Sequence, residues 1–92
     1  MMKRLSENEI ALKLAGLPGW SRVGDHIERQ FRFADFDTLI AFVNAVAAVA
    51  REQDHHPDVR FGYSDCTVAY TTHSADGITA RDFAAAERID KL

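Results

Sequence analysis

The chain has 92 residues, and we expect a single domain spanning 1–92. Hydrophobic residues make up 47% and charged residues 27%, a balance typical of a folded domain rather than a disordered one. The 11 lysines and arginines are scattered and the net charge is −3, which argues against nucleic acid as a partner. The most apolar run, 39–50, is shorter than the roughly 20 residues that span a membrane. With Cys66 as the single cysteine, no internal disulfide can form, and we expect a cytoplasmic protein.

The N-terminal third predicts a short helix followed by a hairpin. Ser6 and Glu9 have the spacing of a capping box, in which the serine accepts from a helical amide and the glutamate reaches back. The Leu-Pro-Gly stretch at 17–19 ends this helix. Gly24-Asp25 is a two-residue turn signal between strands predicted over 20–23 and 26–33.

A longer helix is predicted from a cap at Asp35 or Asp37 to about residue 53. One apolar stripe of this helix has the helical period, and a second stripe beside it is formed by Phe42, Val46 and Val49. A helix that is apolar over so much of its circumference must be covered on more than one side. We therefore expect a homodimer or homotetramer, formed through this helix or through a sheet edge.

The C-terminal part predicts two further strands and a last helix. The strands, 59–63 and 66–72, are joined by a tight turn at 64–65. Thr79 and Asp82 have the spacing of a second capping box, which starts the helix. The order α-β-β-α-β-β-α predicts an α+β fold, a four-stranded antiparallel sheet with helices packed on one face.

The stretch 54–58, which reads DHHPD, is the most unusual in the chain. It follows the predicted long helix, which its proline prevents from continuing. Unpaired carbonyls at a helix end favour a protonated imidazole, and histidine exchanges protons near neutral pH. His73 lies at the end of the last predicted strand, and the outer ends of a hairpin lie close together. We therefore expect His55, His56 and His73 to line one pocket, with Asp82 beyond them.

Each of these residues also has a purely structural interpretation. Paired histidines can simply stabilise a helix end, a histidine at the end of a strand is often a surface residue, and Asp82 is accounted for as the capping partner of Thr79. A zinc site is disfavoured, because adjacent histidines diverge whereas metal ligands on a helix usually stand four residues apart. Cys66 falls inside a strand on the core-facing side, so we expect neither a metal site nor Cys-His chemistry.

Taken together, these motifs resemble the pterin-4a-carbinolamine dehydratase family. The resemblance rests on the DHHPD stretch at 54–58, on Tyr63, on Thr72-His73 and on the segment 77–82, which reads GITARD. The capped first helix and the Pro-Gly-Trp turn at 18–20 extend the resemblance over nearly the whole chain. It implies a four-stranded α+β fold and dimers or tetramers.

The resemblance also implies an activity, the removal of water from 4a-hydroxytetrahydrobiopterin to give quinonoid dihydropterin. No electron is transferred, so no cofactor is expected, and imidazoles can supply both proton transfers. By similarity the catalytic residues are His55, His56, His73 and Asp82, with His55 and His73 as the principal proton-transfer groups. The substrate-binding residues implied by the resemblance are His55, His56, Pro57, Thr72, His73, Ser74 and Ala75, with support from Asp54 and Glu52.

Two positions depart from the family pattern. Arg51 stands where an acid is common, and Val59 stands where a tryptophan is common. Arg51 either faces the pocket with the opposite charge or points to solvent while Glu52 compensates. Two other functions remain open: a dimerisation cofactor or protein-binding module of the same fold, and a pterin-binding protein in molybdenum cofactor metabolism. The intact set of histidines favours the enzyme.

Overall fold

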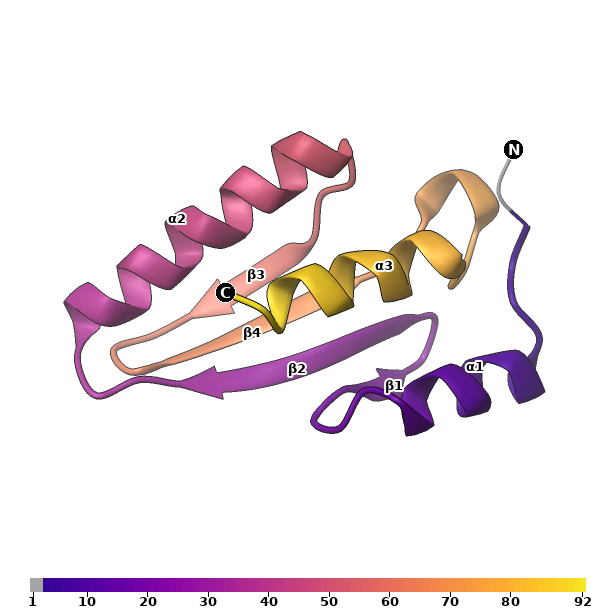
Figure 1. The fold of residues 1–92 in the computed structure, drawn as a ribbon, viewed down its shortest axis with the longest axis horizontal. Coiled ribbons are helices and arrows are strands. Elements are labelled where there is room, and N and C mark those ends of the chain that lie inside the picture. Colours follow the sequence, from indigo (N-terminus) through magenta and orange to yellow (C-terminus); the bar gives the residue numbers. More distant parts are fainter. Residues whose placement is uncertain (1–2) are drawn as a thin grey trace.

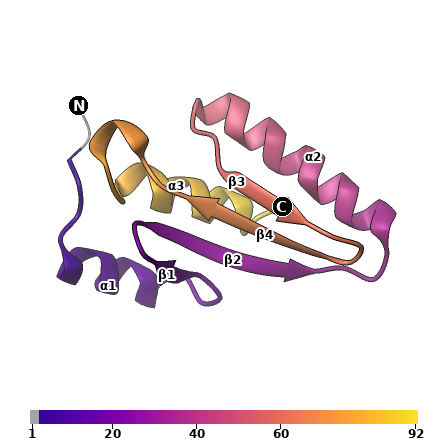
Figure 2. The same ribbon diagram turned by 180° about the vertical axis from the view of Figure 1, so that it is seen from behind.

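The computed structural model describes residues 3–92 and has the predicted order of elements (Figure 1). Its helices and strands are α1 (Glu7–Ala15), β1 (Ser21–Val23), β2 (His26–Arg32), α2 (Phe36–Gln53), β3 (Asp58–Phe61), β4 (Asp65–Tyr70), the 3-10 turn η1 (His73–Ala75) and α3 (Ala80–Ile89). The strands form one antiparallel sheet in the order β1-β2-β4-β3. The view from behind shows the strands in front of α3 (Figure 2), so one face of the sheet is uncovered. The α+β prediction is therefore confirmed.

Local sequence signals account for the ends of the helices. Ser6 and Glu9 form the predicted capping box of α1, with Glu9 N–H donating to Ser6 Oγ at 3.2 Å. Of the two aspartates expected to cap α2, Asp35 does so, accepting from the Thr38 amide at 2.8 Å. No helix of residues 3–92 is long and apolar enough to cross a membrane.

Strand β4 ends two residues earlier than the sequence predicts. Its last pair in the sheet is Tyr70 with Ile27 of β2. Thr72 instead pairs with Gly77 in an isolated bridge, which closes a short loop around η1. This bridge directs the chain from the sheet into α3, so that the end of β4 and the start of α3 lie together.

The core lies between the sheet and the helices α2 and α3. Alternate residues of β4 point into it, so Cys66, Val68 and Tyr70 are fully buried, as the alternation predicts. Arg29, which interrupts the apolar alternation of β2, stacks its guanidinium on the Phe31 ring at 4.7 Å and donates to Asp90. The guanidinium thus lies at the edge of the core, next to the end of α3, and β2 continues through Arg29 without interruption.

The apolar surface of α2 is largely covered within the chain itself. Val46 and Val49 are buried, and Phe42 packs against Phe31 of β2 and against Phe33, which follows the strand, at ring distances of 4.7 and 5.0 Å. Phe36, at the start of the helix, is 42% exposed. The expected contact of α2 with another subunit stays a prediction.

Candidate active site

The centre of the candidate site is a buried carboxylate, Asp82, in the first turn of α3. Its Oδ1 lies 2.6 Å from Nε2 of His55. Its Oδ2 accepts from Oγ1 of Thr72 and from the amide of Thr79, each at 2.9 Å. Asp82 is 0% exposed and His55 is 8% exposed, and a buried carboxylate is stable only where its oxygens are bonded. The structure thus brings together three of the predicted site residues, His55, Thr72 and Asp82.

The end of α2 fixes the backbone of His55. Asp54 has a left-handed conformation with φ of 50°, and its amide donates to the Arg51 carbonyl at 3.3 Å. The His55 amide donates to the Ala50 carbonyl at 3.1 Å, which completes a Schellman motif. The chain reverses at this motif so that His55 is buried while His56 is exposed. Asp54 therefore contributes its backbone conformation. Among the described residues, no hydrogen bond or ion pair of its side chain accompanies its predicted supporting role.

The start of α3 fixes Asp82. Thr79 and Asp82 form the predicted capping box, and Thr79 Oγ1 accepts from the Arg81 amide at 3.2 Å. Thr79 Oγ1 also lies 2.8 Å from Thr72 Oγ1, so both hydroxyls are bonded. The partial positive charge of the helix N-terminus further favours a carboxylate there. Asp82 is thus at once a capping residue and the partner of His55. Sequence reasoning missed Thr79 as a site residue, although its capping motif was the signal.

The His55 ring lies between Tyr70 and the protein surface. The two rings stack at a centroid distance of 5.2 Å and an interplanar angle of 28°. Burial, and then the negative charge of Asp82, raise the pKa of Tyr70 to about 12. The exposed edge of His55 opens into a hollow of about 230 Å³ between α2 and α3, where Arg81 is a further lining residue. The contact with Asp82 occupies Nε2, so Nδ1 is the ring nitrogen left for a further partner.

His56 opens into a different hollow. It lies between α2 and β3, with a volume of about 350 Å³, and Arg51 and Pro57 line it together with apolar side chains. Arg51 lines this hollow and is itself exposed, and the two placements expected for it stay predictions. The Glu52 carboxylate binds Arg88 of α3 at 2.6 and 3.3 Å, and this bond lowers the pKa of Glu52. No contact of Glu52 with the histidines accompanies its predicted supporting role.

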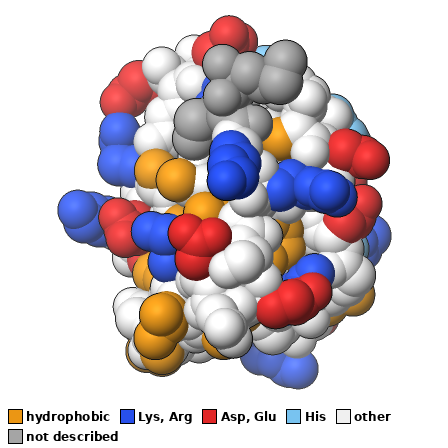
Figure 3. All heavy atoms as spheres, turned by 90° about the vertical axis from the view of Figure 1, so that its right-hand side faces the viewer, with side chains coloured by type: hydrophobic (Ala, Val, Ile, Leu, Met, Phe, Trp, Pro, Cys, Tyr) orange, Lys and Arg blue, Asp and Glu red, His pale blue; other side chains and the backbone are white. Residues whose placement is uncertain are grey.

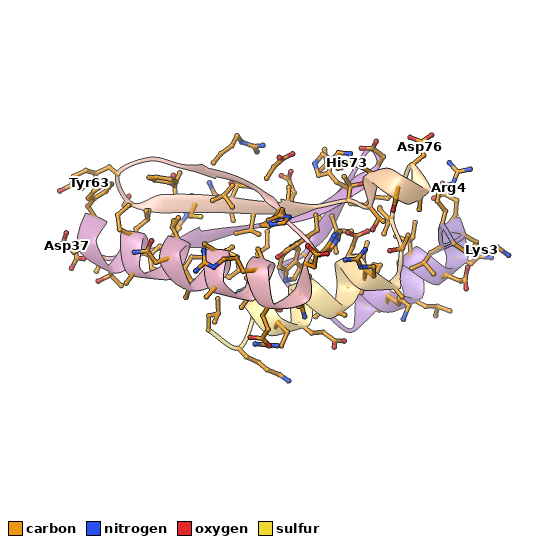
Figure 4. The ribbon with its side chains drawn as sticks, turned by 90° about the horizontal axis from the view of Figure 1, so that it is seen from above. Lys3, Arg4, Asp37, Tyr63, His73 and Asp76 are labelled. Atoms are coloured by element: carbon orange, nitrogen blue, oxygen red, sulfur yellow. The ribbon has the colours of Figure 1, made fainter. Side chains whose placement is uncertain are left out.

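His73, Ser74 and Ala75 form η1, directly after Thr72. His73 and Ser74 are exposed, and Figure 4 shows His73 on the side of the strands that faces away from α2 and α3. His73 lines none of the hollows described at His55 and His56. The common pocket for all three histidines therefore stays a prediction, with His73 one residue from the Asp82 cluster.

Basic and acidic side chains are interspersed on the surface at the end of the molecule where η1 and the N-terminal segment lie (Figure 3). A hollow of about 440 Å³ at this end is lined by none of the predicted site residues. Within residues 3–92, no three His, Cys, Asp or Glu side chains gather closely enough to hold a metal ion. Cys66 is 1% exposed, and burial, followed by the charge of Asp65, raises the pKa of its thiol.

Comparison with known proteins gives one consistent family. The sequence profile described as "Pterin 4 alpha carbinolamine dehydratase" matches residues 3–92. A protein of Chloroflexus aurantiacus is 48% identical over 99% of this chain and 98% of its own length. It carries the provisional name pterin-4-alpha-carbinolamine dehydratase.

Two solved structures are similar to this chain. A protein of Brucella melitensis, described as a transcriptional coactivator/pterin dehydratase, superposes with a TM-score of 0.92 at 35% identity, covering 97% of both chains. A pterin dehydratase-like protein described as a RuBisCO assembly factor of the alpha-carboxysome has a TM-score of 0.70 over 82% of this chain and 89% of its own. At 23% identity, the second likeness shows a common fold alone. On the profile match and the identity to its relatives, the chain belongs to the pterin 4 alpha carbinolamine dehydratase family.

Proposed function

We propose that this protein dehydrates a pterin carbinolamine, 4a-hydroxytetrahydrobiopterin, to quinonoid dihydropterin and water. The observation that carries the proposal is the buried pair of His55 and Asp82, whose atoms lie 2.6 Å apart. Membership of the family supports the same substrate. His55 lies in the connection after α2 and Asp82 in the first turn of α3, so folding brings together two residues that are 27 positions apart.

The reaction needs two proton transfers and no electron transfer. The C4a–O bond breaks as the hydroxyl gains a proton and departs as water. The lone pair of N5 forms the C4a=N5 bond, and the N5 proton passes to a base. Acid–base catalysis of such a step typically contributes about 10²–10⁴-fold in rate.

His55 is suited to one of these transfers. An ionised carboxylate only accepts hydrogen bonds, so Asp82 keeps a proton on Nε2 and orients the ring, while Nδ1 exchanges a proton with the substrate. In the proposal His73 supplies the second transfer and His56 holds the substrate. One pterin must therefore reach from the hollow at His55 to both of these residues, which do not line that hollow. The pterin ring of the substrate is lined, in the proposal, by Pro57, Thr72, Ser74 and Ala75. The proposal includes no metal and no other cofactor.

The test follows enzymatically generated 4a-hydroxytetrahydropterin by absorbance, with EDTA present. We expect rapid dehydration by the parent protein, a sharp loss in His55→Ala and in His73→Ala, and no activity in the double variant. His26→Ala is the matched control, because His26 lies on β2 and its ring contacts Glu28, outside the cluster. A fully active double variant, or a parent protein without activity, would reject the proposal.

A protein-binding role is the second candidate, favoured by aromatic side chains exposed at one end of the molecule. Phe36 and Phe61 are 42% and 48% exposed, and Phe36 stacks on Tyr63 at 6.4 Å. Self-association through this region or through α2 would give the homodimer or homotetramer expected from the sequence. Sedimentation of the parent protein and of Phe36→Glu distinguishes the monomer from the oligomer. A monomeric parent would contradict the oligomer.

A further inference from the structure

Tyr70 is the one side chain of the described residues with a fully buried polar atom that lacks a hydrogen-bond partner. The residue is 0% exposed at the end of β4, and the unpaired atom is its hydroxyl oxygen. An unpaired buried hydroxyl is unfavourable, so packing alone would favour phenylalanine at this position. What the residue contributes must therefore be sought in its ring as well as in its hydroxyl.

The ring of Tyr70 lies against the face of the His55 imidazole. The centroids are 5.2 Å apart and the planes differ by 28°, which is an offset stack. Asp82 meets the same imidazole at its Nε2 edge, at 2.6 Å. One hydrogen bond at an edge leaves the ring free to swing about its Cβ–Cγ bond. The stack removes this freedom because it blocks one face.

The remaining edge of the imidazole is the one that can meet a ligand. Within residues 3–92 no hydrogen bond is made by Nδ1, and this atom is not among the buried polar atoms that lack a partner, so it reaches the surface. His55 lines the hollow between α2 and α3. Arg81 is the charged group at this hollow, and its guanidinium donates to the Asp54 carbonyl at 2.8 Å. The groups facing His55 are thus Asp82 at Nε2, Tyr70 on the face and Arg81 at the opening.

The hydroxyl of Tyr70 is not suited to proton transfer at neutral pH. Burial and the charge of Asp82 raise the pKa of Tyr70 to about 12, so the phenol keeps its proton. An aromatic face, by contrast, stabilises a cation placed over it. The part of Tyr70 that can act on His55 is therefore its ring.

We propose that Tyr70 is a positioning residue for His55, acting through its ring and not through its hydroxyl. The stack sets the plane of the imidazole so that Nδ1 faces the hollow between α2 and α3. The catalytic consequence rests on the proposed dehydratase function, whereas the placement of the ring does not.

The test compares Tyr70→Phe, which keeps the ring, with Tyr70→Leu, which removes it. In NMR spectra of the ligand-free protein, we expect the His55 ring protons to be shifted upfield by the aromatic neighbour in the parent and in Tyr70→Phe. The shift is lost in Tyr70→Leu. In the dehydration assay, we expect Tyr70→Phe to keep kcat within about twofold and Tyr70→Leu to lose about tenfold in kcat with little change in KM, as for a misplaced catalytic group.

Three results would overturn the proposal. A Tyr70→Phe variant as inactive as Tyr70→Leu would assign the role to the hydroxyl. A Tyr70→Leu variant with the parent kcat would show that the stack does not matter for the reaction. An unshifted His55 spectrum in the parent would show that the stack is absent, and this readout holds even if the protein proves not to be a dehydratase. If Tyr70→Leu does not fold, Tyr70→Met replaces it, because methionine fills more of the space without an aromatic face.

Discussion

Replacing Asp82 with asparagine tests the candidate site at its centre. The carboxamide has the size of the carboxylate, and its oxygen can still accept from Thr72 and from the Thr79 amide. Its NH₂ group then faces Nε2 of His55, which can accept this hydrogen bond only when it is unprotonated. The ring proton therefore moves to Nδ1, the nitrogen that is proposed to exchange protons with the substrate.

The magnitudes separate asparagine from alanine at this position. Alanine leaves three buried donors without an acceptor, on His55, Thr72 and Thr79, at about 1–3 kcal/mol each. That is a large part of the roughly 5–15 kcal/mol by which a domain is stable, so the alanine variant tests folding. Asparagine keeps two of the three bonds, and we expect the free energy of unfolding to fall by about 1–3 kcal/mol. The expected loss in kcat is about 10²–10⁴-fold.

The assay measures kcat for dehydration and the urea midpoint of the same preparations. Asp37→Asn is the matched control, because Asp37 is exposed at the far end of α2 (Figure 4). It should keep kcat, and it should lower the free energy of unfolding by at most about 1 kcal/mol, since Asp37 lies in the first turn of the helix. A folded Asp82→Asn variant with kcat within threefold of the parent would refute the reasoning about the tautomer. A variant that unfolds would show that the carboxylate charge is worth more to stability than the three bonds indicate.

Three further predictions concern residues around the cluster. Asp54→Gly should raise the free energy of unfolding by about 1 kcal/mol, because glycine adopts the left-handed φ of 50° without strain, and should keep kcat. A folded variant with reduced kcat would give the Asp54 carboxylate the supporting role. Since the pKa of Tyr70 is raised from 10.0 to about 12, the folded chain keeps a proton that the unfolded chain releases. The free energy of unfolding is therefore unaffected by this group below about pH 10. By about pH 12 it has fallen by about 3 kcal/mol. The free energy of unfolding, measured with urea between about pH 8 and pH 11, should therefore fall more steeply with pH for the parent than for Tyr70→Phe. Equal slopes would contradict the raised pKa of Tyr70. Glu52→Gln removes the negative charge from the surface pair with Arg88 and should leave kcat unchanged, with a small stability effect that high salt removes. A clear loss of kcat would return Glu52 to the site.

The elements of the fold follow from local patterns in the sequence. The two capping boxes, at Ser6 and at Thr79, start helices where the sequence predicts them, because such motifs depend on residues only three positions apart. The turn at Gly24 likewise separates β1 from β2, and Gly24 has a positive φ of 61°. The predicted end of β4 was two residues too late, because the departure of Thr72 from the sheet depends on its bridge to Gly77.

The side-chain geometry of the site depends on contacts that no local pattern contains. The shared pocket that the sequence predicts for His55 and His56 stays a prediction. The sequence does not tell which of the two rings is buried, because neighbours in an extended segment point to opposite sides. The structure has His55 buried against Asp82 and His56 exposed at another hollow. The alternation of β4 predicted that Tyr70 points into the core, but not that the His55 ring would meet it there.

The most direct test of the account is the tautomer of His55, read from the ¹⁵N chemical shifts of its ring. The spectrum is recorded at about pH 8.5, above the ordinary histidine pKa of about 6.5. We predict a protonated Nε2, bonded to Asp82, and an unprotonated Nδ1 available to a pterin. In Asp82→Asn the two nitrogens should exchange these states. A parent protein with its proton on Nδ1 would contradict the central claim that Asp82 prepares His55 for proton transfer.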